Sequence, residues 1–202
     1  MNALAAPAYI SEEQYRDGEE FASQKHEWFN GEVFPMPGGT DNHTTICFSL
    51  NVLLGNALRG TNFRARNSEQ RVKIAASGLE TYPDSVIYEK PARFVGTGNS
   101  TLLTPRVIFE VLSPGTGTYE RCIKFEQYKR VETLTDYVLV AQDSICVEHF
   151  HRRGDDWLYR SFITRADSLF IDGVNATLPL DGIYEDLDLP EPLLVLPAAS
   201  GE

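Results

Sequence analysis

The segment from Pro105 to Tyr128 constrains the fold of this chain more than any other part of the sequence. Its apolar run, Val107 to Leu112, has the length and β-branched content of a buried central strand. One ionisable residue, Glu110, lies in the middle of that run. A carboxylate in such a strand is costly unless a cation or a hydrogen-bond donor meets it. We therefore expect a positive or polar group to reach the interior at this strand.

A second acid and a lysine occur at comparable places in the sequence. Asp84 begins an expected strand that runs from Ser85 to Tyr88. After the central strand, a Gly-rich turn leads into an expected short helix on which Lys124 and Tyr128, four residues apart, share one face. Two hard oxygen donors and a cation are the set that divalent-metal phosphoester chemistry uses.

Each of these residues also has an ordinary structural interpretation. An acid after proline, such as Asp84, often begins a turn. Hydrogen bonds alone can satisfy a buried glutamate, and a lysine on a helix usually faces solvent. Tyr128 could bind a phosphate or water, or it could only pack in the core. Alternation along the strand places Glu110 on the face opposite that of Phe109.

The helix after the turn is expected to bury one side, with Lys124 at the border of that side. The expected buried positions are Cys122, Phe125, Tyr128 and Val131. Cys47, Cys122 and Cys146 are odd in number, and their spacing suits neither zinc nor a disulfide framework. We expect all three to be reduced thiols in the core.

Length and composition limit the functions that the chain can have. Its 202 residues, 42% of them hydrophobic, predict a single domain with a core at about 9–188 and a Pro-rich tail at 189–202. The net charge of −11 counts against strong binding to nucleic acid, because lysine and arginine supply most of the affinity for phosphate. No apolar run approaches the roughly 20 residues of a membrane span. The N-terminus lacks signal-peptide features, so we expect a cytoplasmic protein.

Local patterns predict most of the remaining elements. Ser11 and Gln14 have the spacing of a capping box, and Asn30-Gly31 predicts a hairpin with a type I′ turn. Asp41 is a candidate N-cap for an amphipathic helix at 42–58. The other expected elements are helix 11–22, strands 25–29, 32–36, 63–66, 71–75, 136–142, 145–151, 157–164, 169–171 and 174–178, an irregular loop at 90–104, and a helical turn at 183–187.

These residues, in this order, resemble the Uma-two family, a branch of the PD-(D/E)XK nuclease superfamily. The resemblance covers roughly 9–186. The matching positions are Pro83-Asp84, Glu110 in the segment EVLSP, Lys124, Tyr128, Lys25-His26-Glu27, Asn30-Gly31-Glu32-Val33, Met36, His43 and Tyr137-Val138-Leu139-Val140.

The resemblance implies a fold, a reaction and a set of site residues. The fold is α/β, a restriction-endonuclease-like mixed sheet flanked by helices, with additional C-terminal strands. The activity is Mg²⁺-dependent hydrolysis of DNA by a homodimer, and Mn²⁺ is an alternative cofactor. Asp84 and Glu110 would bind the metal, Glu27 would assist them or lie on the hairpin surface, and Lys124 would polarise the attacking water. His43 is either a recurrent family position or a capping or packing residue.

Two departures from the family pattern and two rival functions remain open. The superfamily usually places its lysine two residues after the second acid, where this chain has Leu112, so the resemblance moves that role to Lys124. The family typically has Asp before Arg121, and here that residue is Glu120. The rival functions are a non-catalytic module that binds nucleic acid or protein, and hydrolysis of a substrate other than duplex DNA.

Overall fold

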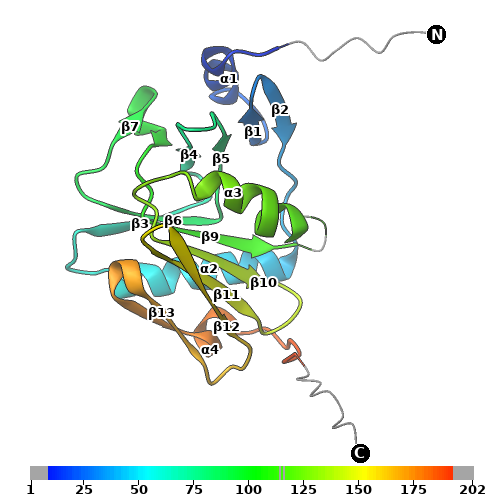
Figure 1. Cartoon of the computed structure of the whole chain (residues 1–202). Helices are drawn as coiled ribbons and strands as arrows, with labels where there is room; N and C mark the ends of the chain where they lie inside the picture. Colours follow the sequence, from blue (N-terminus) through cyan, green and yellow to red (C-terminus); the bar gives the residue numbers. More distant parts are fainter. Residues whose placement is uncertain (1–8, 114, 116, 193–202) are drawn as a thin grey trace, which may run out of the picture.

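The fold contains two β-sheets and a small β-hairpin (Figure 1). The computed structural model describes residues 9–113, 115 and 117–192, and within these residues each sheet has six strands. The central sheet contains, in spatial order, β12 (Asp156–Phe162), β11 (Val147–Arg153), β10 (Asp136–Ala141), β9 (Val107–Leu112), β6 (Ser85–Glu89) and β3 (Phe63–Asn67). The second sheet contains β2 (Glu32–Pro35), β1 (His26–Phe29), β5 (Glu80–Thr81), β4 (Arg71–Lys73), β8 (Thr101–Leu102) and β7 (Phe94–Val95). The hairpin consists of β13 (Ser168–Ile171) and β14 (Ala176–Pro179).

The helices are short except for one. They are α1 (Glu12–Glu19), α2 (Asp41–Ala57), the 3-10 turns η1 (Thr97–Asn99) and η3 (Asp172–Val174), the π-helical turn η2 (Tyr119–Lys124), α3 (Phe125–Tyr128) and α4 (Leu180–Ile183). In Figure 1, α2 lies behind the central sheet and α3 in front of it. The sheet is therefore covered on both faces, which explains why β9 and β10 are buried along their whole length.

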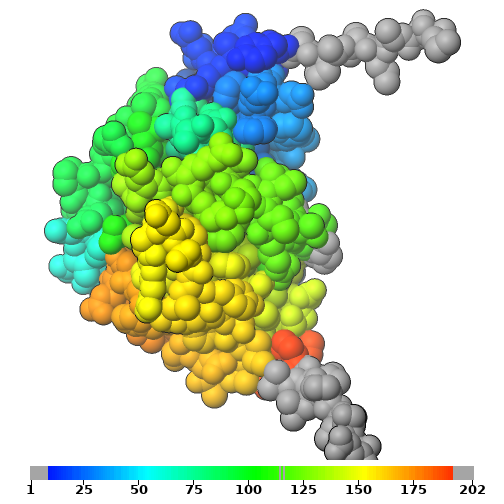
Figure 2. Space-filling model, viewed as in Figure 1, coloured from blue at the N-terminus to red at the C-terminus, as the bar shows by residue number. Residues whose placement is uncertain are grey.

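The two faces of the central sheet belong to two hydrophobic clusters. Phe109 packs with Leu50 of α2 and with the β13–β14 hairpin. Ile108 packs on the opposite face with Phe125 and Tyr128. This division confirms the predicted alternation along the strand, in which Glu110 and Phe109 point to opposite faces. In the space-filling view the green segment that contains α3 lies directly against the yellow β11 and β12 (Figure 2).

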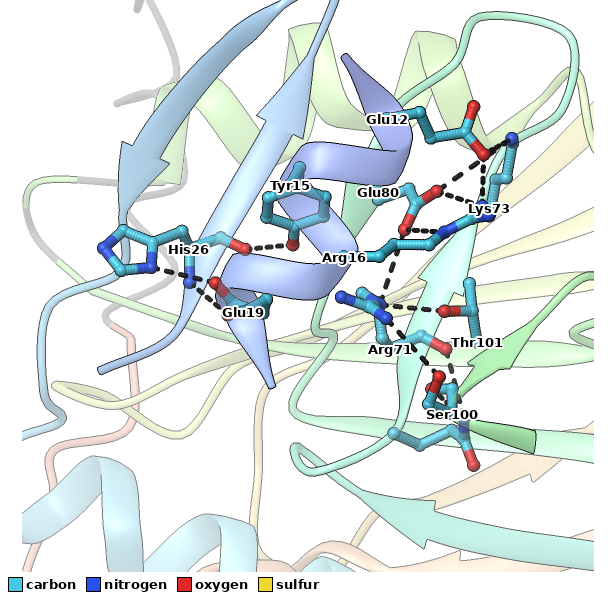
Figure 3. Close-up of polar contacts among 11 residues, drawn as sticks. Glu12, Tyr15, Arg16, Glu19, His26, Arg71, Lys73, Glu80, Ser100 and Thr101 are labelled. Atoms are coloured by element: carbon cyan, nitrogen blue, oxygen red, sulfur yellow. Dashed lines mark hydrogen bonds and ion pairs between the residues drawn. The ribbon is translucent and has the colours of Figure 1, made fainter. Parts of the chain in front are cut away.

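A network of charged side chains holds α1 against the second sheet (Figure 3). Glu80 of β5 is fully buried, and its carboxylate accepts from Arg16 of α1 and lies 3.4 Å from Nε of Arg71 on β4. Arg71 Nε also donates to Thr101 Oγ1 at 2.8 Å. Ser11 forms the predicted capping box at the start of α1, with both reciprocal bonds to Gln14.

Several boundaries differ from the sequence-based expectations. Thr40, rather than Asp41, caps α2, because its hydroxyl accepts from the amide of His43. The segment 90–104, expected as an irregular loop, supplies β7 and β8, and β8 pairs in parallel with β4. The expected helical turn at 183–187 lies earlier, at α4.

The chain ends and the turn before η2 lie partly outside the described residues. The expected tail, 189–202, is described only to residue 192, and the turn at 113–117 lacks residues 114 and 116. Within the described part of the tail, Ile145 N donates to Pro190 O at 2.9 Å. This backbone bond ties the beginning of the tail to the segment that precedes β11.

The cysteines are free thiols, as predicted, but they are not all buried. Cys47 and Cys146 are half-buried, and Cys122 is exposed. The expectation that Cys122 lies on the buried side of its helix is therefore wrong. The reason is that Lys124 faces the interior, and Cys122, two residues before it, lies about half a turn away around the helix.

Candidate active site

A buried ion pair joins the central strand to the helix that follows it. Lys124 Nζ lies 2.9 Å from Glu110 Oε1, and the two side chains are only 3% and 2% exposed. Glu110 sits in the middle of β9. The cation that the acid in this strand required is therefore Lys124.

Lys124 lies on the buried face of its helix, which begins with the π-turn η2. Glu120, Lys124 and Tyr128 follow one another at intervals of four residues and are all buried, as residues on one helix face are. Cys122, two residues from Lys124, lies on the other side and is exposed. Tyr137 OH donates to the carbonyl of Glu120 at 3.1 Å and anchors the turn from below. Lys124 was expected at the border of the buried side and instead lies within it.

Glu27 reaches the same lysine from the second sheet. Glu27 Oε1 lies 3.1 Å from Lys124 Nζ, and Tyr119 OH donates to Glu27 Oε2 at 3.2 Å. The pairing of Trp28 with Glu80, extended by one residue, sets Glu27 opposite Thr81, whose hydroxyl donates to the Glu27 carboxylate. The interpretation of Glu27 as a surface hairpin residue is therefore wrong.

Tyr128 packs in the core, one of the two interpretations that the sequence left open, and its hydroxyl contacts a site residue. Its ring is fully buried and packs against Tyr137, with ring centroids 5.4 Å apart. Its hydroxyl donates to Glu110 Oε1 at 3.0 Å, the oxygen that also faces Lys124. Tyr128 therefore packs in the core and at the same time fixes the Glu110 carboxylate.

Asp84 lies beside this group and faces an open cleft. The register that pairs Ser85 with Phe109, extended by one residue, sets Asp84 opposite Glu110. Val111 N donates to Asp84 Oδ2 at 2.7 Å, and His43 Nε2 lies 3.3 Å from Asp84 Oδ1. Asp84 and His43 both line a cleft of about 590 Å³ between the N-terminal part of α2 and the β1–β2 segment.

The pKa values reflect burial and the crowding of acids around one lysine. Burial raises the pKa of Glu110 to about 8, and the nearby carboxylate of Asp84 adds to this rise, while Lys124 opposes it. Burial alone would lower the pKa of Lys124, but Glu110 and Glu27 outweigh it and raise that pKa well above its usual value. Burial likewise opposes ionisation of Glu27, but Lys124, with the hydroxyls of Thr81 and Tyr119, lowers its pKa.

The donor set suits a hard divalent cation. Asp84 and Glu110 are carboxylates on adjacent strands, and their mutual repulsion contributes to the raised pKa of Glu110. A cation bound between them would favour the ionised form of both. Oxygen donors are the ligands that Mg²⁺ and Mn²⁺ prefer. The residues present therefore fit such an ion.

Sequence patterns did not reveal every residue of this group. Thr81 reaches Glu27 because β1 and β5, which are not consecutive in the chain, pair in the sheet. Tyr119 reaches Glu27 from the π-turn η2. No local pattern in the sequence indicates either contact. His43 and Cys47, four residues apart on α2, lie near Asp84, and one ligand atom from each of the three lies within 4.8 Å of the others. The i, i+4 spacing of His43 and Cys47 was a visible signal, since such residues share a helix face.

The fold and this group of residues define a protein of the restriction-endonuclease-like α/β class. A solved structure from Anabaena variabilis, described as "a putative nuclease belonging to DUF820", has a similar fold, with a TM-score of 0.64. The two chains are 14% identical, and the similarity covers 80% of this chain and 90% of that one. This likeness confirms the fold class.

The family is shown by sequence. The model of the Uma2 family, described as "Putative restriction endonuclease", matches residues 12–180, so this chain belongs to that family. The Synechocystis protein slr1290 is 33% identical over 179 residues, which cover 88% of this chain and 93% of that protein. A second Synechocystis protein, sll1609, is 30% identical over 159 residues, covering 78% and 90% of the two chains. The predicted family is thus confirmed, and its description indicates nuclease activity.

One further finding concerns membranes. Among residues 9–113, 115 and 117–192, no helix is both long enough and apolar enough to cross a bilayer.

Proposed function

We propose that this protein is a metal-dependent endonuclease that hydrolyses DNA phosphodiester bonds with Mg²⁺, for which Mn²⁺ can substitute. The observation that carries the proposal is Lys124, buried between Glu110 and Glu27 at 2.9 and 3.1 Å, with Asp84 opposite Glu110 at the wall of an open cleft. A structural ion pair alone needs one acid. Here two carboxylates contact the lysine, and a third, Asp84, lies opposite one of them on the neighbouring strand, which leaves excess negative charge for a divalent cation.

The residues of the site would each have a separate role in the reaction. A divalent cation, when bound, supplies an activated water and stabilises charge on the phosphate. Asp84 and Glu110 would hold it, with Glu27 in support. Lys124 would orient the attacking water and offset developing negative charge. Tyr128 donates to Glu110 and so positions it.

A local basic surface beside the cleft supports a nucleic-acid substrate despite the acidic composition. A hollow of about 730 Å³ shares Asn51 and Asn67 with the cleft. It is lined by Arg59, Arg64 and Arg66, and none of these has an ion-pair partner within the described part of the chain. Guanidinium groups that no carboxylate neutralises are suited to bind phosphates along a strand that enters the cleft.

Removing two of these arginines is expected to weaken DNA binding by a similar factor for all DNA sequences. The double variant Arg59→Ala/Arg66→Ala should reduce the slope of log affinity against log salt by about 1–2, because each lost phosphate contact releases about one counterion fewer. Fluorescence anisotropy with labelled duplex and single-stranded DNA, over a series of salt concentrations, measures the slope. Arg153→Ala, at the exposed far end of β11, is the matched control. An unchanged slope in the double variant would place the DNA elsewhere.

Cleavage of supercoiled plasmid and of single-stranded DNA, with Mg²⁺ or Mn²⁺ at low salt, tests the proposal. We expect Asp84→Asn and Glu110→Gln to lose most cleavage, because each removes an anionic oxygen donor of nearly unchanged shape. Glu126→Gln, an exposed acid on α3, should cleave like the parent protein. Equal cleavage by all four proteins would identify a contaminating nuclease and refute the proposed site.

The remaining parts of the proposal concern assembly and cellular context. Cutting both strands of a duplex needs two sites, so we propose a two-fold symmetric homodimer, with the chain as a single domain acting in the cytoplasm. Sedimentation of the protein with and without a short duplex tests the dimer.

A binding module is the second candidate function. The deep burial of Lys124, whose side chain is only 3% exposed, favours this candidate over catalysis, because it limits the access of a phosphate to the ammonium group. DNA binding without cleavage in any metal would support this alternative.

A further inference from the structure

A second group of potential metal ligands lies on the opposite face of the central sheet from Glu110. Asp136 begins β10, and it pairs in register with His151 of β11. His149 precedes His151 by two residues and therefore points to the same face. Asp172 begins η3, the turn between β13 and β14. Three separate elements thus bring two carboxylates and two imidazoles to one place.

The four side chains approach one another closely. Asp136 Oδ1 lies 2.7 Å from His149 Nε2 and 3.0 Å from His151 Nδ1. One ligand atom from each residue, including Asp172, lies within 4.8 Å of the other three. Ligands at about 2.0–2.1 Å from a tetrahedral ion are separated from one another by about 3.3 Å. Small side-chain shifts would bring this group to that geometry.

The surrounding residues hold the carboxylates in position. Asp136 Oδ2 accepts from Thr135 Oγ1 at 2.7 Å and from Gly173 N at 3.0 Å, which leaves Oδ1 for the two imidazoles. Gly173 admits no side chain, because a Cβ there would lie 2.2 Å from Asp136 Oδ2. Arg160 pairs with Asp172 Oδ2 at 3.0 Å and orients it. Outer partners of this kind are typical around metal ligands.

Hydrogen bonding alone accounts for only part of this arrangement. Two neutral imidazoles that donate to Asp136 would satisfy that carboxylate, but they do not explain why a second carboxylate, Asp172, converges on the same point. His149 is fully buried and directs its Nε2 at Asp136, so this nitrogen is the one that would bind an ion shared with the carboxylate.

We propose that Asp136, His149, His151 and Asp172 bind a first-row transition-metal ion, with zinc the best fit to the donor set. Two nitrogens and two carboxylate oxygens suit Zn²⁺ better than Mg²⁺, which prefers oxygen ligands throughout. Two carboxylates also neutralise a divalent ion. Four protein ligands leave no open position, so the ion would be structural and would tie η3 to the β10–β11 pair. His151 and Asp172 are partly exposed and give the ion a path from solvent.

Zinc titration of the tag-free, chelator-treated full chain tests this site. We expect one equivalent of Zn²⁺ to bind in calorimetry and to raise the Tm of the parent protein. His151→Gln and Asp172→Asn change partly exposed side chains and should each weaken zinc affinity by more than about tenfold. His26→Gln is the matched control, because His26 also pairs with one carboxylate, Glu19, at 3.0 Å but belongs to no four-residue group.

Co²⁺ as a spectroscopic probe separates this site from the proposed active site. Nitrogen ligation should give the same visible spectrum in the parent protein and in Glu110→Gln, and that spectrum should be lost in His151→Gln. Far-UV circular dichroism verifies that each variant is folded. If His151→Gln does not fold, Asp172→Asn takes its place in the cobalt experiment. Absence of zinc and cobalt binding in the parent, or equal binding in both ligand variants, would overturn the proposal and leave a hydrogen-bonded Asp–His network.

Discussion

Lys124→Met is expected to lower the free energy of unfolding by about 3–5 kcal/mol at pH 9, because it removes the cation from a buried pair and leaves the acids uncompensated. The lysine side chain is 3% exposed and lies 2.9 Å from Glu110 and 3.1 Å from Glu27. Methionine fills a similar volume, so little of the loss would come from a cavity. Urea denaturation monitored by tryptophan fluorescence gives the free energy. A loss below about 1 kcal/mol would contradict the buried pair.

The cost of this substitution should depend on pH in a defined direction. The pKa of Glu110 is about 8 in the parent protein, and loss of Lys124 raises it further, since the lysine opposes the rise. In the unfolded chain the carboxyl has its ordinary, lower pKa, so the folded variant takes up a proton as pH falls and recovers stability. The parent carboxyl, with a pKa of about 8, also takes up its proton in this range, so we expect the destabilisation at pH 6 to be up to about 1.4 kcal/mol smaller than at pH 9.

Lys129→Met is the matched control for this experiment. Lys129 lies one turn after Phe125 on the same helix, and it pairs with Glu126, whose side chain is 64% exposed. A pair in contact with solvent contributes little to stability, so this variant should change the free energy of unfolding only slightly and equally at both pH values. A similar pH-dependent loss in Lys129→Met would show that general surface charge, not the Glu110 pair, causes the effect.

Local patterns in the sequence were sufficient for the elements that form the core of the site. The apolar run at 107–112 predicts β9 with the bounds that the structure shows, and Asn30-Gly31 predicts the hairpin that carries Glu27. Asn30 and Gly31 both have positive φ, at 51° and 90°, as a type I′ turn requires. The strand alone also predicts a cation or hydrogen-bond donor near Glu110, because burial of an unpaired carboxylate is costly.

Contacts that depend on register or on irregular backbone could not be predicted in the same way. The helix that carries Lys124 begins with a π-turn, which no pattern in the sequence predicts. The bond from Thr81 to Glu27 depends on how β1 pairs with β5, two strands separated by β2, α2, β3 and β4 in the chain. Such pairings follow from the packing of whole sheets, and no short motif encodes them.

The same limit applies to the group around Asp136. His149 and His151 alternate along a strand and are visible in the sequence as a pair on one face. Asp172 joins them only because the β13–β14 hairpin folds back on the central sheet, where Gly173 permits close approach to Asp136. The fold, rather than the sequence spacing, creates this set of four ligands.

Metal-dependent cleavage is expected to rise about fifty-fold between pH 6 and pH 8 at subsaturating Mg²⁺. The proposed site needs the ionised form of Glu110, whose pKa burial raises to about 8. The ionised fraction is then roughly 1% at pH 6 and about half at pH 8, and the proton competes with the cation for the carboxylate. Saturating Mg²⁺ should therefore move the midpoint of the rate's pH dependence to lower pH. Single-turnover rates measured at constant ionic strength would show this shift.

His43 provides the decisive control, because its pKa is also raised and it contacts the same site. A hydrogen bond to Asp84 raises the pKa of His43 above its usual value, so a histidine could produce a similar rise in rate. In His43→Gln the overall rate can fall, but the dependence on pH should persist if Glu110 controls it. If the dependence disappeared in His43→Gln, the titrating group would be the histidine. A rate that is constant from pH 6 to pH 8 would instead mean that Glu110 is already ionised at pH 6. Lys124 or a tightly bound cation would then outweigh the cost of burying this carboxylate.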